Sequence, residues 1–150
     1  MLSARLIQLI EDHSDQIIQG ILVEVRRDEL LPRYRELSDS ELISRFENVC
    51  RNLGHFLAES DELVVAQDYE ELAEERFNEQ IPLHEVVHAA HVVKNRLTGH
   101  ARDNAFEQTP VELYAEAELE RLINRFFDRI VFHIVRGYEK ALVNALKTAV

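Results

Sequence analysis

The amino-acid sequence predicts an all-α protein of about six helices, the last of which is unusually long. Two observations support this fold class. The 150 residues include only 4 glycines and 3 prolines, so few positions interrupt a helix. Apolar residues recur every three or four positions along most of the chain, as on one face of a helix, and no segment shows the convincing alternation of a strand.

The length and composition predict one globular domain over residues 1–150. A chain of this size can bury a real core but is too short for two comfortable domains. Apolar residues make up 46% of the sequence and charged residues 30%, which is typical of a globular protein and excludes low-complexity disorder.

The first predicted helical unit extends from the N-terminus to a point before Pro32. Its apolar pattern is interrupted near His13 and Ser14, which indicates either a broken helix or a pair of helices. The apolar face consists of Leu2, Leu6, Ile10, Ile17, Ile18, Ile21, Leu22 and Val25.

The second predicted helix begins at a capping box, in which the side chains of Ser38 and Glu41 can each bind a free backbone N–H group. Cys50 lies on the apolar face of this helix, so we expect a buried and unreactive thiol. That face is formed by Leu42, Phe46, Val49, Leu53, Phe56 and Leu57.

The third predicted helix opens near Ser60, Asp61 and Glu62. The fourth opens at Pro82, because proline is tolerated in a first turn, where its missing N–H costs nothing. The apolar residues of the third helix are Leu63, Val64, Tyr69, Leu72 and Phe77, and those of the fourth are Leu83, Val86, Val87, Ala90, Val93 and Leu97.

The last predicted helix begins at Thr109, Pro110 and Glu112, which combine a cap, a first-turn proline and a reciprocal glutamate. A helix from there to about residue 147 would be roughly 57 Å long. A compact domain of this size has a diameter near ~40 Å. We therefore expect this helix to project beyond its own domain or to pack against a second copy.

The last helix also carries more apolar surface than one core can cover, which predicts a homodimer. One flank would seat the helix on its own domain, and a second copy would cover the other. We place the dimer interface on the stripe of Ile123, Phe127, Ile130, Ile134 and Tyr138, which Ala141 and Ala145 continue. The second apolar flank consists of Val131, Val135, Leu142 and Leu146.

The charge balance restricts the partners. With 28 acidic and 17 basic residues the chain has a formal net charge of -11, which makes nucleic acid and anionic membranes unfavourable partners. A single cysteine fits a reducing compartment. No apolar run approaches the ~20 residues of a membrane span, and Glu11, Asp12 and His13 interrupt the N-terminus where a signal peptide needs its apolar core. We expect a cytoplasmic protein.

The fourth predicted helix contains the sequence H-E-x-x-H at His84, Glu85 and His88. Two histidines one turn apart can share a zinc ion while the glutamate polarises the bound water, so a zinc-dependent hydrolase is one alternative function. A third ligand is not evident: the metzincin pattern fails, and nothing marks Glu107 or Glu112 as a ligand. A pH-sensitive or adventitious metal-binding stripe of His84, His88 and His91 is a further alternative, because three clustered imidazoles titrate near neutral pH. A solvated or boundary face is the simplest interpretation of these histidines.

A haem-binding globin sensor is the other alternative. In a globin-like fold the proximal histidine would come from residues 61–80, and this segment contains none. His55 could line a distal wall, but without a proximal ligand we expect no haem. We accordingly expect neither a catalytic nor a metal or cofactor site.

Several short stretches together resemble the N-terminal sensory domain of the RsbR-type stressosome co-antagonists, the RsbRD N-terminal family. The most characteristic stretch is Ile81-Pro82-Leu83-His84-Glu85-Val86-Val87-His88-Ala89-Ala90. The other matching residues are Leu31, Pro32, Leu37, Ser38, Glu41, Leu42, Asn52, Leu53, Phe56, Leu57, Tyr69, Leu72, Arg76, Glu118, Leu119, Leu122, Phe126 and Phe127.

The resemblance implies a globin-like helical domain without haem, which dimerises and passes a signal to an output domain or downstream signalling protein. It thus implies a non-catalytic signal-input domain of a bacterial cytosolic signalling system, involved in the stress response, with room for a small-molecule ligand. The sequence ends at Val150 without an output domain, so we expect either a stand-alone member of the family or a fragment of a longer protein. The phosphorylation chemistry of an output domain is therefore not carried over to this chain.

Overall fold

A computed structural model describes residues 2–59, 62–103 and 110–149 of the chain. Within these residues every regular element is helical, which confirms the all-α class. The described residues form five α-helices and one short 3-10 helix, whereas the sequence predicted about six helices. The elements are α1 (Leu2–Arg27), η1 (Tyr34–Glu36), α2 (Asp39–Glu59), α3 (Glu62–Asn78), α4 (Leu83–Asp103) and α5 (Pro110–Thr148).

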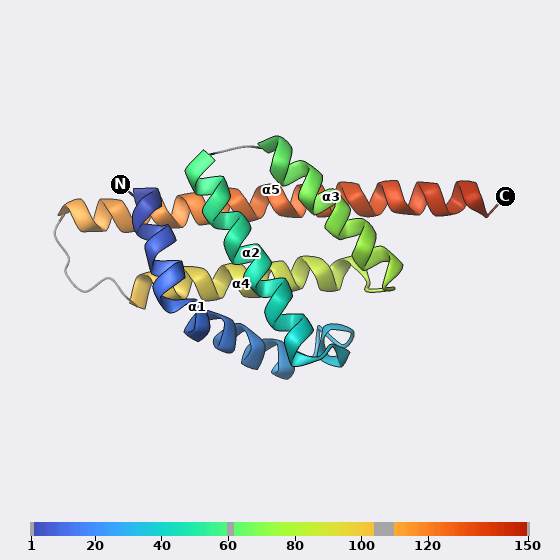
Figure 1. Cartoon of the computed structure of the whole chain (residues 1–150), viewed down its shortest axis with the longest axis horizontal. Coiled ribbons are helices and arrows are strands. Elements are labelled where there is room, and N and C mark those ends of the chain that lie inside the picture. The colour runs from blue at the N-terminus through green and yellow to red at the C-terminus, as the bar shows by residue number, and fades with distance from the viewer. Residues whose placement is uncertain (1, 60–61, 104–109, 150) are drawn as a thin grey trace.

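The two C-terminal helices form the centre of the bundle. Helices α4 and α5 run antiparallel and in contact, and α3 packs obliquely on α5 in the most extensive helix contact of the structure (Figure 1). Helix α2 crosses this layer, and α1 packs against α2 and α4. The C-terminal end of α5 extends beyond the other helices, as its predicted length requires (Figure 1).

The predicted helix boundaries agree well with the structure. Helix α1 is kinked at His13, whose φ of -121° and ψ of 15° lie outside the helical region, so the interrupted pattern corresponds to one bent helix. The backbone N–H of Glu41 donates to Ser38 Oγ at 3.2 Å, as expected at the start of α2. Helix α4 follows Pro82, and α5 starts at Pro110. The predicted starts at Ser60-Asp61 and Thr109 lie outside the described residues.

The predicted apolar faces contribute to the core where their side chains are described, which leaves out Leu2 and Leu6, and there is one correction in α3. Leu63 is 82% exposed and Val64 is also exposed, whereas Val65 and Ala73 are buried with Tyr69. The inner face of α3 is therefore rotated from the predicted one. Within the described residues, no helix is long and apolar enough to cross a membrane.

The contact between α3 and α5 depends on Gly137. A Cβ at this position would lie 2.6 Å from the Cβ of Ala73 and 3.0 Å from the carbonyl oxygen of Glu70. Real Cβ contacts are longer, so glycine allows these two helix backbones to approach more closely than any other residue would.

Candidate functional site

Helix α5 has an inner face that belongs to the protomer core. All five residues on which the sequence placed the dimer interface, Ile123, Phe127, Ile130, Ile134 and Tyr138, lie on this face and are at most 8% exposed. The Tyr138 hydroxyl donates to the carbonyl oxygen of Ile81 at 2.6 Å, and its ring packs against Phe77. Because the chain's own helices cover these side chains, they are not accessible to a second copy in this fold.

The outer flank of α5 is the accessible apolar surface. Phe132 is 50% exposed, Leu142 51% and Leu146 60%, and Val131 and Val135 are half-buried. Four of these, Val131, Val135, Leu142 and Leu146, are the second flank identified from the sequence. Helical spacing places them on one side of α5, where the exposed Asp128 and Glu139 also lie. The position of the expected interface is therefore revised from the inner to the outer flank.

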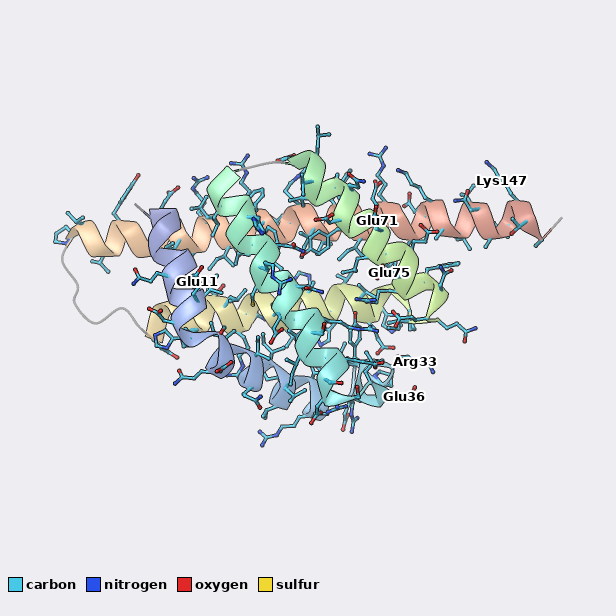
Figure 2. The ribbon with its side chains drawn as sticks, viewed as in Figure 1. Glu11, Arg33, Glu36, Glu71, Glu75 and Lys147 are labelled. Carbon is cyan, nitrogen blue, oxygen red and sulfur yellow. The ribbon has the colours of Figure 1, made fainter. Side chains whose placement is uncertain are left out.

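Charged side chains join α3 to the second half of α5. Figure 2 shows Lys147 near the projecting end of α5, and Glu71 and Glu75 on α3. Between the two helices, Lys140 Nζ lies 3.0 Å from Glu70 Oε2 and Arg136 Nε lies 3.5 Å from Glu70 Oε1. The acidic residues of α3 thus serve partly as ion-pair partners of α5.

The H-E-x-x-H residues have structural environments that differ from a zinc site. Glu85 is 1% exposed, and its Oε1 accepts the backbone N–H groups of Arg33 at 2.9 Å and Tyr34 at 3.4 Å. His88 Nε2 lies 2.6 Å from Asp28 Oδ2, whereas His84 is exposed. Glu85 therefore holds the segment after α1 against α4, and its carboxylate is not turned toward a water shared by the two histidines.

Asp28 is the second anchor of this segment. The backbone N–H of Leu30 donates to its carboxylate at 2.9 Å, and this bond, followed by the contact with His88, holds the pKa of Asp28 below its usual value. Figure 2 shows Arg33 and Glu36 in the same region at the edge of the bundle. The carboxylates of Glu85 and Asp28 together fix the chain between α1 and α2.

The other histidines occupy different parts of the bundle. His55 is exposed on α2, and the rings of His13 and His100 pack in a tilted arrangement with their centroids 5.0 Å apart. His133 is buried on α5, on the side that faces α3, and neither ring nitrogen has a hydrogen-bond partner among the described residues. Within these residues no three His, Cys, Asp or Glu side chains are grouped as metal ligands would be.

Cys50 is a buried free thiol, as expected. Burial raises its pKa to about 11, and the charge of Glu47 contributes. The thiol is therefore protonated and unreactive near neutral pH.

The structure contains a partly buried cluster of two arginines and one glutamate that was not predicted from the sequence. Arg45 Nη2 donates to Glu79 Oε2 at 2.5 Å, and Arg76 Nη1 donates to Glu79 Oε1 at 2.8 Å. Burial raises the pKa of Glu79, but the two arginines outweigh this effect and the pKa is lowered overall. Arg76 follows Tyr69 and Ala73 at helical spacing, so its position on the inner face of α3 was the signal available in the sequence.

The fold and its surfaces define a helical domain with a long terminal helix whose outer flank is exposed and apolar. The family described as RsbT co-antagonist protein rsbRD N-terminal domain matches residues 10–147, and the chain belongs to this family. The resemblance seen in the sequence is thereby confirmed. No curated protein and no solved structure matches the chain.

Proposed function

We propose that this chain is a non-catalytic signal-input domain of a bacterial cytosolic signalling system, and that it acts as a homodimer through α5. Membership of the RsbT co-antagonist family supports a regulatory role. The same proposal includes a globin-like fold without haem and a cytoplasmic location. It also includes a downstream signalling protein or output domain as the partner. The partner would receive the signal through α5, because this helix extends furthest from the bundle.

The exposed outer flank of α5 is the observation that carries the proposal. The leucines at positions 142 and 146 are more than half exposed, and they continue the line of Val131 and Val135 over four turns. Exposed leucines on one side of a projecting helix are typical of a contact with another chain. Two copies of one helix flank form a self-complementary interface, as a twofold dimer requires.

The two alternative functions have less support. The zinc-dependent hydrolase would need Glu85 as its general base, and this carboxylate is buried against backbone N–H groups. The haem sensor would need a proximal histidine, and α3 contains none. Both His84 and His55 are exposed rather than directed into the core.

Sedimentation equilibrium on outer-flank variants tests the dimer. We expect a dimer for the unmodified chain at tens of micromolar, and at least a hundredfold weaker association for the double variant Leu142→Glu/Leu146→Glu. In this variant each subunit would bury two fewer leucine side chains, and the dimer would bring four carboxylates together. Both effects oppose association, and their sum exceeds the ~2.7 kcal/mol that corresponds to this factor.

The matched control is Leu63→Glu, which changes an even more exposed leucine on α3 and leaves the outer flank intact. It is expected to associate like the unmodified chain. A monomeric unmodified chain at this concentration, or equal loss of association in Leu63→Glu, would contradict the proposal. Circular dichroism on each variant shows whether it remains folded.

A further inference from the structure

A cavity of about 50 Å³ lies at the centre of the bundle, between η1, α2, α3, α4 and α5. Its inner wall is buried and includes Phe46 on α2, Val93 on α4 and Ile130 on α5. Its rim contains half-buried residues, among them Val49 and Ala90. The cavity therefore has an apolar interior and an accessible rim.

Both charged residues that line this cavity are arginines. Arg76 is more than nine-tenths buried, and Arg45 lies at the half-buried rim. The Nη1 atom of Arg45 is buried and has no hydrogen-bond partner among the described residues. A buried guanidinium N–H normally has an acceptor, so the unpartnered Nη1 group beside the cavity is free to donate to a bound molecule.

The neighbouring carboxylates do not meet this requirement. The two oxygens of Glu79 are already bound, one by Arg45 Nη2 and the other by Arg76 Nη1. Glu85 is occupied by the backbone N–H groups of the segment after α1. Glu75 Oε2 also lies near the cluster, 3.6 Å from Arg76 Nη1. None of these three carboxylates lines the cavity, so the charged groups that a ligand in it meets are the two guanidinium groups, beside apolar side chains.

The size and chemistry of the cavity define one class of ligand. A water molecule needs roughly 10 to 15 Å³ of such space, so the cavity accommodates roughly three to five non-hydrogen atoms. We propose that it binds a short aliphatic carboxylate, with the carboxylate on Arg45 Nη1 and the alkyl group against the apolar inner wall. Arginine binds carboxylates through charge-assisted hydrogen bonds, which suits this assignment.

The cavity would be the sensing site of the signal-input domain. This inference therefore deepens the proposed function and rests on it. Its floor includes Ile130 and Ile134 of α5, so occupancy acts directly on the helix that we propose as the interface. Binding of the ligand is measured independently of the oligomeric state. A failure to bind therefore leaves the dimer proposal intact, and a monomeric chain leaves the binding result intact.

Titration with ¹³C-labelled propionate, followed by NMR on the full chain, tests the site. We expect saturable binding of one propionate per chain. The neutral analogue propionamide lacks the charge, and nitrate lacks the alkyl group, so both are expected to bind at least tenfold more weakly. Binding of nitrate or propionamide as tight as that of propionate would overturn the assignment.

Two substitutions locate the binding. Arg45→Gln removes the guanidinium, and its matched control Arg51→Gln removes an exposed guanidinium from the same helix. Ala90→Leu fills the cavity from its rim, and Ala66→Leu enlarges another half-buried alanine, which lies on α3 outside the cavity. We expect at least a tenfold loss of propionate affinity in Arg45→Gln and Ala90→Leu and an unchanged affinity in the two controls.

The absence of saturable propionate binding by the folded, unmodified chain overturns the proposal. Unchanged affinity in either Arg45→Gln or Ala90→Leu also does so, because the ligand would then be bound elsewhere. Circular dichroism accompanies each titration, and Arg45→Lys provides a second test if Arg45→Gln is unfolded. The lysine keeps the charge but loses the Nη1 donor, and it is expected to bind propionate less tightly than the unmodified chain.

Discussion

At the scale of single residues, His133 combines burial with unmet hydrogen-bonding capacity. Burial lowers its pKa, and the positive charge of Arg129 lowers it further. Arg136 on the same helix acts in the same direction, whereas Glu62 and Glu70 on α3 partly oppose the shift. The native structure therefore favours the neutral imidazole.

The lowered pKa predicts a loss of stability in acid. As the pH falls, the unfolded chain binds a proton at His133 near the ordinary histidine pKa of about 6.5, before the native chain does. The contribution of the neutral imidazole to the free energy of unfolding is therefore fully present above this pH. This contribution is lost as the pH falls from there through the lowered native pKa. We expect His133→Gln to lose less stability than the unmodified chain between pH 7.5 and pH 5.0, as measured by urea unfolding.

The substitution reduces the acid effect without removing it, because burial and the nearby His13 also lower the pKa of His100. His84→Gln serves as the control, since His84 is exposed, and it is expected to show the acid loss of the unmodified chain. An identical pH response in His133→Gln and the unmodified chain would show that His133 does not contribute.

Glu85 is expected to stabilise the fold rather than to support catalysis. Glu85→Ala leaves two backbone N–H groups, the partly buried one of Arg33 and the buried one of Tyr34, without their acceptor. We expect a decrease of about 2 to 3 kcal/mol in the free energy of unfolding. Glu85→Gln retains a carbonyl oxygen as acceptor, so its free energy of unfolding should decrease less than that of Glu85→Ala. Urea unfolding of both variants checks the order, and a change below about 0.5 kcal/mol in Glu85→Ala would contradict it.

At the scale of helices, two glycines predict opposite responses to the same substitution. Alanine favours a helix over glycine by about 1 kcal/mol when space allows. At Gly99 a Cβ meets nothing within 4 Å, so Gly99→Ala should raise the free energy of unfolding by about 0.5 to 1 kcal/mol. At Gly137 the added methyl group overlaps α3, so Gly137→Ala should lower it by about 1 to 3 kcal/mol.

Urea unfolding of the two glycine variants under the same conditions measures this difference. Each variant is the control of the other, because both make the same change within a helix. Stabilisation of the protein by Gly137→Ala would mean that α3 and α5 can move apart at little cost.

At the scale of the whole molecule, the two flanks of α5 predict two kinds of defect. Phe127 is buried in the protomer core, so Phe127→Glu removes a large apolar contact and buries a charge without a partner. We expect the free energy of unfolding to fall by more than about 4 kcal/mol, which is a large fraction of the stability of an ordinary domain. Thermal unfolding followed by circular dichroism measures the loss.

Phe132→Glu is the matched control on the outer flank, where the phenylalanine is half exposed. It is expected to remain folded at the temperature at which Phe127→Glu has unfolded. Equal melting temperatures for the two variants would contradict the assignment of Phe127 to the core.

The sequence alone determined the properties that depend on local spacing. The apolar period predicted the helices, the interruption near His13 predicted the bend in α1, and the proline at 110 predicted the start of α5. The family could also be recognised from short stretches of sequence, and the match over residues 10–147 confirms it. These properties are local because helix periodicity and capping involve residues only a few positions apart.

Only the tertiary structure decided which of two apolar flanks faces the core. The sequence offered two flanks of similar character on α5, and it indicated the one that contains Phe127 as the dimer interface, which the structure buries. It likewise could not join Arg45 of α2 to Glu79 after α3, or Glu85 of α4 to the backbone at Arg33. Such contacts link residues 34 and 52 positions apart, and they depend on how whole helices pack rather than on any local pattern.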